Sequence, residues 1–232
     1  MQKSTADIDG RNCIIYGTQK PEYILIQPVD ERDMAGLDEE ATHLCGESGG
    51  KILLVSFPVK DWNAELSPWK AGAVLGDEGF AGNADKTLIF VIKELVPFIR
   101  LQYEVGQDVK WSIGGYSLAG LFALYCAYRT DHFSAVAGIS PSVWFPGWIE
   151  FVRENSPLTK AVYLSLGDKE EKTRNPVMSK VGDNIREMAD IYAHSSNISR
   201  VTLEWNEGNH FNEPGKRIVK GFTGLCRFMS SI

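Results

Sequence analysis

The chain has 232 residues, of which 44% are hydrophobic and 23% charged, a composition that allows a sizeable buried core. Its 24 Lys and Arg against 30 Asp and Glu give a formal charge of −6, and no window clusters basic residues, so we expect no nucleic-acid partner. Residues 1–13 lack the apolar core of a signal peptide, and no stretch approaches the roughly 18 apolar residues of a membrane span. We therefore expect a cytoplasmic protein that does not bind membranes. No pattern indicates an oligomeric state.

Short apolar segments alternate with amphipathic ones along the first half of the chain. The long segment 58–86 is rich in Gly and Trp, and we expect it to be ordered because it contains Trp62, Trp69 and Phe80. The helix that follows it contains Pro97, where it should bend or end. The patterns predict strands at 12–17, 22–28, 51–57 and 109–115, and helices at 30–46 and 86–103.

The second half continues the same alternation. It predicts a helix from Ser117 to Tyr128, strands at 134–140, 161–167 and 200–205, a loop at 141–148, and helices at 177–192 and around 218–229. Such a chain is typical of the α/β class, with a mostly parallel central sheet and helices on both faces. No linker, repeat or lid-sized insertion interrupts it, so we expect a single α/β domain over residues 1–232, without a large cap domain.

The four cysteines, Cys13, Cys45, Cys126 and Cys226, lie far apart in the sequence, and three of them fall in apolar helical patterns. Metal sites and small disulfide-linked domains need cysteines at closer, regular spacing. We therefore expect buried free thiols and no metal site.

One glycine-rich turn, "IGGYSLAGLFALY" at residues 113–125, stands where an apolar strand changes into a helical pattern. A dinucleotide-binding turn needs spaced glycines, but Gly114 and Gly115 are adjacent. A phosphate-binding loop would match at Gly115 and Gly120, but the lysine that should follow is missing. The remaining interpretation is a nucleophile elbow, in which Ser117 projects from the carboxyl edge of the sheet.

The elbow pattern G-x-S-x-G is altered here because Ala119 replaces the second glycine. The turn needs small residues two positions before and after the serine, since the strand and helix backbones nearly touch there. Gly115 and Ala119 both satisfy this requirement. A serine in a tight turn can also have no chemical role, so partners elsewhere in the chain must decide between the two interpretations.

A serine nucleophile needs a base, usually a histidine, to take its proton. His43, His132 and His194 lie in or beside helices or connections and read as surface or capping residues. His210 lies in a Gly-containing loop between the last strand and the last helix, which is the position that the order serine, acid, histidine requires. His210 is therefore the candidate base.

The acid should follow the strand at 161–167, where the loop "GDKEEKTRN" offers Asp168, Glu170 and Glu171. Glu170 is the first choice, because many hydrolases place the acid a few residues past the glycine that ends this strand, and Asp168 is the second. At least two of the three should be solvated surface carboxylates.

An oxyanion hole needs two backbone N–H donors, one of them from the residue after the nucleophile, which is Leu118. The second should come from the loop after the strand at 51–57, where we expect Val59 or its neighbour Lys60. The usual His-Gly signature is replaced by "FPVKDW" in this loop.

With these residues in view, the chain resembles the "Putative esterase" family of α/β-hydrolases, which includes siderophore trilactone esterases, feruloyl and acetyl-xylan esterases and S-formylglutathione hydrolases. The resemblance covers nearly the whole chain and rests on "GYSLAGLFALY", "FSAVAGISPSVWF", "LSLGDKEEKTRN" and "NEGNHF". It implies an α/β-hydrolase fold, Ser117 as nucleophile, His210 as base and a carboxylate of "GDKEE" as its partner. It also implies that Trp144 lines the substrate pocket. The chain departs from the family at Ala119, and we expect it to be without the extra N-terminal domain of the larger siderophore esterases.

We therefore expect a serine esterase that hydrolyses small carboxylic esters through an acyl-enzyme intermediate, with no cofactor. Trp62 and Trp144 are the candidate substrate-binding residues, and the missing lid predicts an open site. The alternatives are a catalytically inactive binding module on the same fold, or an esterase specialised for siderophore trilactones or acylated sugars.

Overall fold

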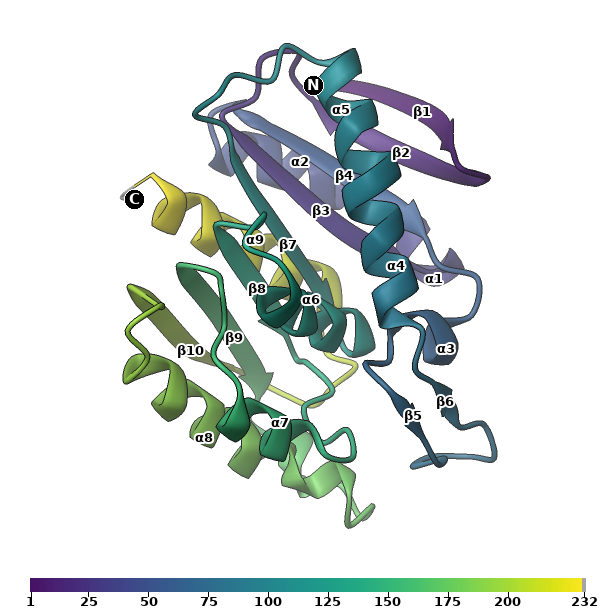
Figure 1. Cartoon of the computed structure of the whole chain (residues 1–232), viewed down its shortest axis with the longest axis vertical. Helices are drawn as coiled ribbons and strands as arrows, with labels where there is room; N and C mark the ends of the chain where they lie inside the picture. Colours follow the sequence, from purple (N-terminus) through teal and green to yellow (C-terminus); the bar gives the residue numbers. More distant parts are fainter. Residues whose placement is uncertain (231–232) are drawn as a thin grey trace.

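An eight-stranded sheet runs through the centre of the molecule in the computed structural model, which describes residues 1–230 (Figure 1). Strands β3, β4 and β7 to β10 are parallel to one another, whereas β2 pairs antiparallel with both β4 and the edge strand β1. The strand order is β1-β2-β4-β3-β7-β8-β9-β10. The bounds are β1 Gln2–Ile8, β2 Arg11–Gly17, β3 Tyr23–Val29, β4 Ile52–Pro58, β7 Lys110–Tyr116, β8 Ala135–Ile139, β9 Ala161–Gly167 and β10 Arg200–Asn206.

Helices cover both faces of this sheet, as the alternating sequence pattern predicts (Figure 1). Helices α2 (Leu37–Glu47) and α9 (Pro214–Met229) pack on one face with a core that includes Leu44 and Phe222. The other face carries the larger core and the helices α4 (Ala84–Phe90), α5 (Val96–Gln102), α6 (Leu118–Arg129), α7 (Trp148–Glu154) and α8 (Val181–Ala193). The central strands are apolar on both faces because each face is covered.

Two adjacent glycines in β7 let helices approach the sheet from opposite faces. A Cβ atom on Gly114 would lie 2.9 Å from the ring of Phe222 in α9, and a Cβ on Gly115 would lie 2.6 Å from the Cβ of Ala119 in α6. Successive strand residues face opposite sides of a sheet, so each glycine makes room for one helix. These two contacts fix the position of the turn that follows β7.

The long helical segment predicted at 86–103 is one path in Figure 1, but it is not a uniform α-helix. A π-helical turn, Val91–Leu95, joins α4 to α5, and Pro97 lies just after it. Proline has no N–H to donate, and its ring crowds the carbonyl four residues earlier. The wider π-turn accommodates both effects, so the helical path continues past Pro97 and does not end there.

Several elements differ from the sequence-based expectation. The helix predicted at 30–46 is divided at Gly36 into α1 (Glu31–Met34) and α2. Strand β1 was not expected, because its sequence is polar and it pairs only with β2 at the sheet edge. Helix α7 was also missed. The segment 58–86 is ordered, as expected, and contains α3 (Trp62–Leu66) and a hairpin of β5 (Lys70–Ala71) and β6 (Phe80–Ala81).

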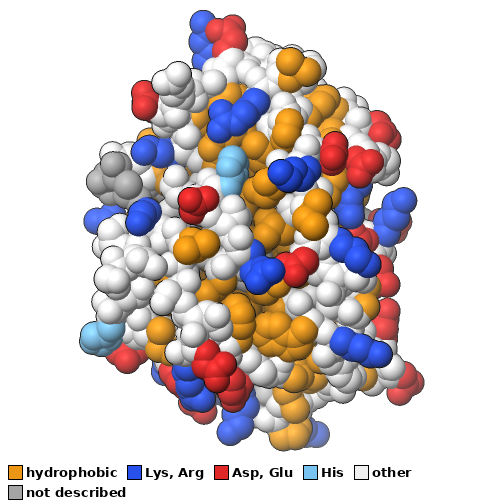
Figure 2. Space-filling view, in the orientation of Figure 1, with side chains coloured by type: hydrophobic (Ala, Val, Ile, Leu, Met, Phe, Trp, Pro, Cys, Tyr) orange, Lys and Arg blue, Asp and Glu red, His pale blue; other side chains and the backbone are white. Residues whose placement is uncertain are grey.

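The surface of the face that carries α4, α6 and α7 shows hydrophobic side chains gathered in a band along its middle, with charged side chains on either side and across it (Figure 2). Within residues 1–230, no helix is both long and apolar enough to cross a membrane. The cysteines are free thiols, and Cys13, Cys126 and Cys226 are buried, as expected, whereas Cys45 is half-buried.

Candidate active site

Ser117 occupies the turn between β7 and α6 in a strained backbone conformation. Its φ of 58° and ψ of −121° lie in a region that L-residues rarely adopt. The Ser117 N–H donates to the carbonyl of Ile139 in β8 (3.1 Å), and the Ser117 carbonyl accepts from Leu121 (3.1 Å). The sheet and the first turn of α6 therefore both hold this turn in place.

The residues around Ser117 are small because the turn leaves no space for larger ones. The methyl group of Ala119 already lies against Gly115, as described above, and a Cβ atom on Gly120 would lie 2.8 Å from the Gly115 carbonyl oxygen. A methyl group is tolerated at position 119, and the altered elbow pattern has the close strand-to-helix packing that the motif requires.

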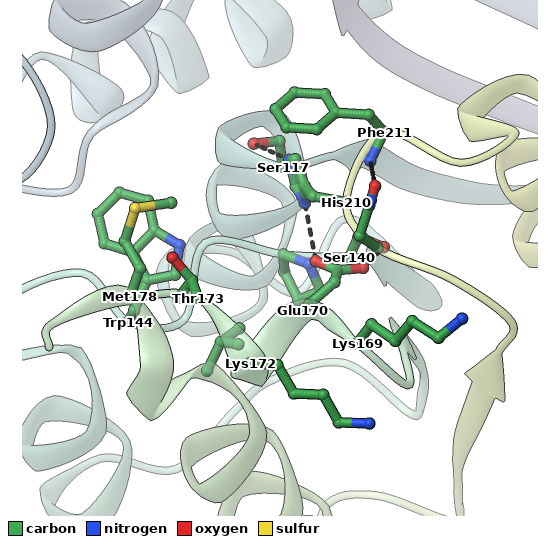
Figure 3. Close-up of a pocket in the computed structure, with 13 residues that line it drawn as sticks. Ser117, Ser140, Trp144, Lys169, Glu170, Lys172, Thr173, Met178, His210 and Phe211 are labelled. Atoms are coloured by element: carbon green, nitrogen blue, oxygen red, sulfur yellow. Dashed lines mark hydrogen bonds and ion pairs between the residues drawn. The ribbon is translucent and has the colours of Figure 1, made fainter. Parts of the chain in front are cut away.

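His210 lies in the loop after β10, and its imidazole stands between Ser117 and Glu170 (Figure 3). Its Nε2 is 3.1 Å from the Ser117 Oγ, and its Nδ1 is 2.8 Å from the Glu170 Oε2. The loop is held from the sheet side as well, because the Tyr116 hydroxyl donates to the His210 carbonyl (2.7 Å). The three residues that sequence order singled out thus form one hydrogen-bonded chain.

Glu170 is the carboxylate of the acid loop that contacts His210, and it is buried, with 9% of its surface exposed. Its Oε1 accepts hydrogen bonds from the Gly167 N–H (2.7 Å) and the Ser140 hydroxyl (2.7 Å). Burial alone would raise the pKa of Glu170, but the hydrogen bond and charge of His210, with these other donors, outweigh burial and hold the pKa below its ordinary value.

Arg217, from the first turns of α9, is a buried cation that the sequence analysis missed. Its guanidinium is 3.0 Å from the Glu170 Oε1, and it also donates to the Ser140 and Tyr116 hydroxyls (3.2 Å each) and to the Glu207 carbonyl (2.8 Å). Arg217 therefore connects the carboxylate beside His210 with the tyrosine that holds the His210 backbone.

A signal for Arg217 was present in the helical pattern. Residue 217 lies four and eight positions before Gly221 and Leu225, both buried residues of α9. Side chains at this spacing share one face of a helix, so the sequence places a charged residue on the buried face. Buried charges are paired in folded proteins, which makes such a residue a candidate partner for a buried acid.

The other two carboxylates of the acid loop point elsewhere. Asp168, the second choice from the sequence, accepts from the Gly208 N–H (2.8 Å). Glu171 forms an ion pair with Arg186 of α8 (2.9 Å). Within residues 1–230, neither forms a hydrogen bond or an ion pair with His210, so Glu170 is the carboxylate that the fold brings to the histidine.

The expected oxyanion-hole donors are only partly available. Leu118 begins α6, where the first backbone N–H groups have no acceptor within the helix. In contrast, the Val59 N–H donates to the Val29 carbonyl (2.9 Å), and the Lys60 N–H donates to the Glu65 carboxylate (3.0 Å). The geometry therefore corrects the expectation for Val59 and Lys60, because both amides are already engaged in holding the loop after β4.

A second hydroxyl lies beside the candidate nucleophile. The Ser142 Oγ is 3.3 Å from the Ser117 Oγ, and the Ser142 N–H donates to the Ser117 carbonyl (3.0 Å). Ser142 is buried and comes from the loop after β8. This loop starts at Ser140, whose φ of 44° also lies in the left-handed region.

The cavity beside Ser117 has a volume of about 410 Å³. Trp144 lines it, as expected, together with Met178 and the strongly exposed Phe211 (Figure 3). Trp62 does not line this cavity. It lies in α3, half-buried and packed against the larger core.

The arrangement can polarise the Ser117 hydroxyl. A histidine between a serine and an ionised carboxylate can take the serine proton while the carboxylate stabilises the imidazolium that forms. In residues 1–230 no group of three or more His, Cys, Asp or Glu side chains is placed to hold a metal ion.

Comparisons with known proteins agree with this fold. An IroE-like serine hydrolase from Shewanella oneidensis superposes with a TM-score of 0.80 at 19% identity, covering 97% of this chain and 80% of that chain. Siderophore hydrolase EstA from Aspergillus nidulans gives 0.78 at 16% identity, covering 98% and 94%. Est1E from Butyrivibrio proteoclasticus gives 0.61 at 10% identity, covering all of both chains. The chain has the α/β-hydrolase fold that the sequence predicted.

A search of the curated proteins finds no match. The model of the family described as "Putative esterase" matches residues 32–207, a segment that contains Ser117 and Glu170 and ends before His210. This match spans most of the chain, and the chain belongs to the Putative esterase family.

Proposed function

We propose that this protein is a serine esterase that hydrolyses small carboxylic esters, with residues 1–232 acting as one catalytic domain. The observation that supports the proposal is the hydrogen-bonded chain from Ser117 through His210 to Glu170, at 3.1 and 2.8 Å. Membership of an esterase family points to the same class of substrate.

In the proposed reaction Ser117 attacks the ester carbonyl while the His210 Nε2 takes its proton. Glu170 holds the imidazole with its Nδ1–H toward the carboxylate and stabilises the imidazolium. The Leu118 N–H donates to the oxyanion of the tetrahedral intermediate, and a donor of this kind contributes about 3 to 4 kcal/mol. His210 then protonates the leaving alcohol, and water hydrolyses the acyl-enzyme. This sequence of steps uses no metal or organic cofactor.

The site suits small substrates because its cavity is limited to about 410 Å³ and is open at the rim, where Phe211 is 86% exposed. We expect faster turnover of p-nitrophenyl acetate and butyrate than of the octanoate. Adding feruloyl, acetylated-sugar and trilactone esters to this panel identifies any specialised alternative, including the siderophore esters suggested by the names of the structural neighbours.

The test is to measure hydrolysis of this panel by the wild type and by Ser117→Ala, with Ser156→Ala as a control at an exposed loop serine. We expect the Ser117 variant to lose at least about 10⁴-fold in kcat and the Ser156 variant to match the wild type. Circular dichroism confirms that each variant is folded. A folded wild type without hydrolysis of any ester would instead favour a binding module, and an active Ser117→Ala would remove the proposed nucleophile.

A further inference from the structure

The cavity beside Ser117 has two unlike sides. In Figure 3, Trp144 and Met178 lie on one side of the Ser117–His210–Glu170 chain, whereas Lys169 and Lys172 lie on the other. All four residues line the cavity. One side therefore presents apolar surface to a substrate, and the other carries two lysines whose ammonium ends extend away from the Ser117–His210–Glu170 chain in this view (Figure 3).

The two lysines are fixed to the acid loop. They flank Glu170 in a short 3-10 turn, in which the Lys172 N–H donates to the Lys169 carbonyl (3.2 Å). The Lys169 N–H donates to the Gly208 carbonyl (3.1 Å), which ties the turn to the loop that carries His210. The same backbone that places Glu170 against His210 thus places both lysines at the cavity.

The nearby carboxylates are engaged with other groups. Glu170 pairs with Arg217 and His210, Glu171 pairs with Arg186, and Asp168 accepts from the Gly208 N–H. Among the residues that the structure describes, neither lysine has an ion pair or a side-chain hydrogen bond. Two lysines that line the cavity, in a chain of net charge −6, are therefore without a partner among the described residues and available to a ligand.

We propose that the preferred substrate carries a carboxylate or a similar anionic group on one side of the ester bond and an apolar group on the other. This inference rests on the proposed esterase function. The anionic group meets Lys169 and Lys172, and the apolar group packs against Trp144 and Met178. Exposed ion pairs of this kind contribute a few-fold each in affinity, so two lysines give about a tenfold preference at low salt.

The test compares esters that differ only in charge. On the acyl side, the mono-p-nitrophenyl ester of adipic acid is compared with p-nitrophenyl hexanoate. On the alcohol side, 3-carboxyphenyl acetate is compared with 3-carbamoylphenyl acetate. The measured quantity is the ratio of kcat/KM for the anionic ester to that for its neutral partner, at low ionic strength and again in added salt.

The matched variants are Lys169→Gln with Lys172→Gln, and Lys160→Gln as the control. Lys160 is exposed and directly precedes β9, whereas Lys169 follows the same strand at its opposite end. We expect a ratio of about ten in the wild type for at least one ester pair, mainly through KM, and the same ratio in Lys160→Gln. The double variant and added salt should both bring the ratio close to one.

A wild-type ratio of one or less for both ester pairs overturns the inference, as does a high ratio that the double variant keeps. These outcomes differ from failure of the proposed function. If neutral esters are hydrolysed in a Ser117-dependent way without any charge preference, only the inference about the substrate fails. If a folded protein hydrolyses none of the esters, the esterase function fails as well.

Discussion

Two buried glutamates show how the same side chain is given opposite properties by its neighbours. Glu170 at the candidate active site is 9% exposed, and Glu40 of α2 is 7% exposed. Glu170 meets a guanidinium, an imidazole, a hydroxyl and a backbone N–H. Among the described residues, the Glu40 carboxylate accepts a side-chain hydrogen bond only from the amide of Gln27 (2.7 Å), with the carboxylate of Asp33 nearby.

The pKa values of the two carboxyl groups diverge accordingly. Burial raises the pKa of Glu40 to about 7, because one amide donor does not offset desolvation and Asp33 adds repulsion. Burial acts on Glu170 in the same direction, but its donors and the charge of His210 outweigh it and lower the pKa of that group. Burial is therefore a poor guide to function, and the partners of a carboxylate decide whether it stays ionised.

The largest expected effect is on kcat, which should depend on Glu170 and not on Glu40. Glu170→Gln should lower kcat by about 10³- to 10⁴-fold, because the amide cannot stabilise the imidazolium or fix its tautomer. Glu40→Gln should leave kcat unchanged, since the Glu40 carboxylate accepts from Gln27 and, within the described residues, bonds to neither Ser117 nor His210. Steady-state hydrolysis of p-nitrophenyl acetate measures both. Equal activity of the wild type and a folded Glu170→Gln would remove Glu170 from the mechanism.

The next effect concerns the stability of the buried ion pair. Arg217→Met leaves Glu170 buried without its guanidinium, and the loss of one partner of such a pair costs about 3 to 5 kcal/mol in the free energy of unfolding. Combining it with Glu170→Gln should restore part of the loss, because no unpaired carboxylate remains. Urea unfolding at neutral pH measures all three variants. Additive losses in the double variant would show that the two side chains are not coupled.

The pKa of Glu170 adds a dependence on pH with a defined sign. A carboxyl group whose pKa is lowered on folding contributes stability that is fully present above its ordinary value near 4.5 and is lost as the pH falls through the folded-state value. The stability of the wild type should therefore fall more steeply below pH 4.5 than that of Glu170→Gln. Parallel losses in the two proteins would contradict this account.

The smallest effect has the opposite sign and belongs to Glu40. Its pKa is raised on folding, so the folded protein keeps a proton that the unfolded chain releases between about pH 4.5 and 7, and stability falls as the pH rises through this window. Glu40→Gln removes this cost and should stabilise the protein by about 2 to 3 kcal/mol at pH 8 relative to pH 4.5, at ~1.4 kcal/mol for each pKa unit.

The control for this measurement is Glu39→Gln, which alters an exposed glutamate on the same helix. Urea unfolding of the two variants and the wild type at pH 4.5 and 8 gives the comparison. If the stability change of Glu40→Gln is the same at both pH values, or is matched by Glu39→Gln, Glu40 does not have the raised pKa described here.

The fold and the serine, acid, histidine order of the candidate site could be predicted from the sequence because both depend on local patterns. The apolar strands that alternate with amphipathic helices are visible one segment at a time, and so is the small-residue turn around Ser117. Strand β1 was missed because an edge strand buries little apolar surface and the sequence of β1 is polar. The π-turn before Pro97 was missed because it depends on how a long helix accommodates the N–H donor that proline lacks.

The missed parts of the site depend on contacts between distant segments. Arg217 and Ser140 meet at Glu170, and Tyr116 meets Arg217, only because α9 and the carboxyl ends of β8 and β7 converge at one edge of the sheet. The Val59 amide, which we expected as the second oxyanion-hole donor, is bonded to the Val29 carbonyl of β3, a pairing that no local pattern reveals. The sequence did favour Glu170 over Asp168, because Glu170 lies a few residues past the glycine that ends β9.

The most direct test of the account is the labelling of the folded protein with a fluorophosphonate probe, followed by peptide mapping. The probe reacts with a serine only where a base activates it. We predict stoichiometric modification of Ser117 in the wild type, none in Ser117→Ala, and slow modification in Glu170→Gln. Absence of labelling in folded wild-type protein, or modification of a different serine, would contradict the assignment of Ser117, His210 and Glu170 as the working site of an esterase.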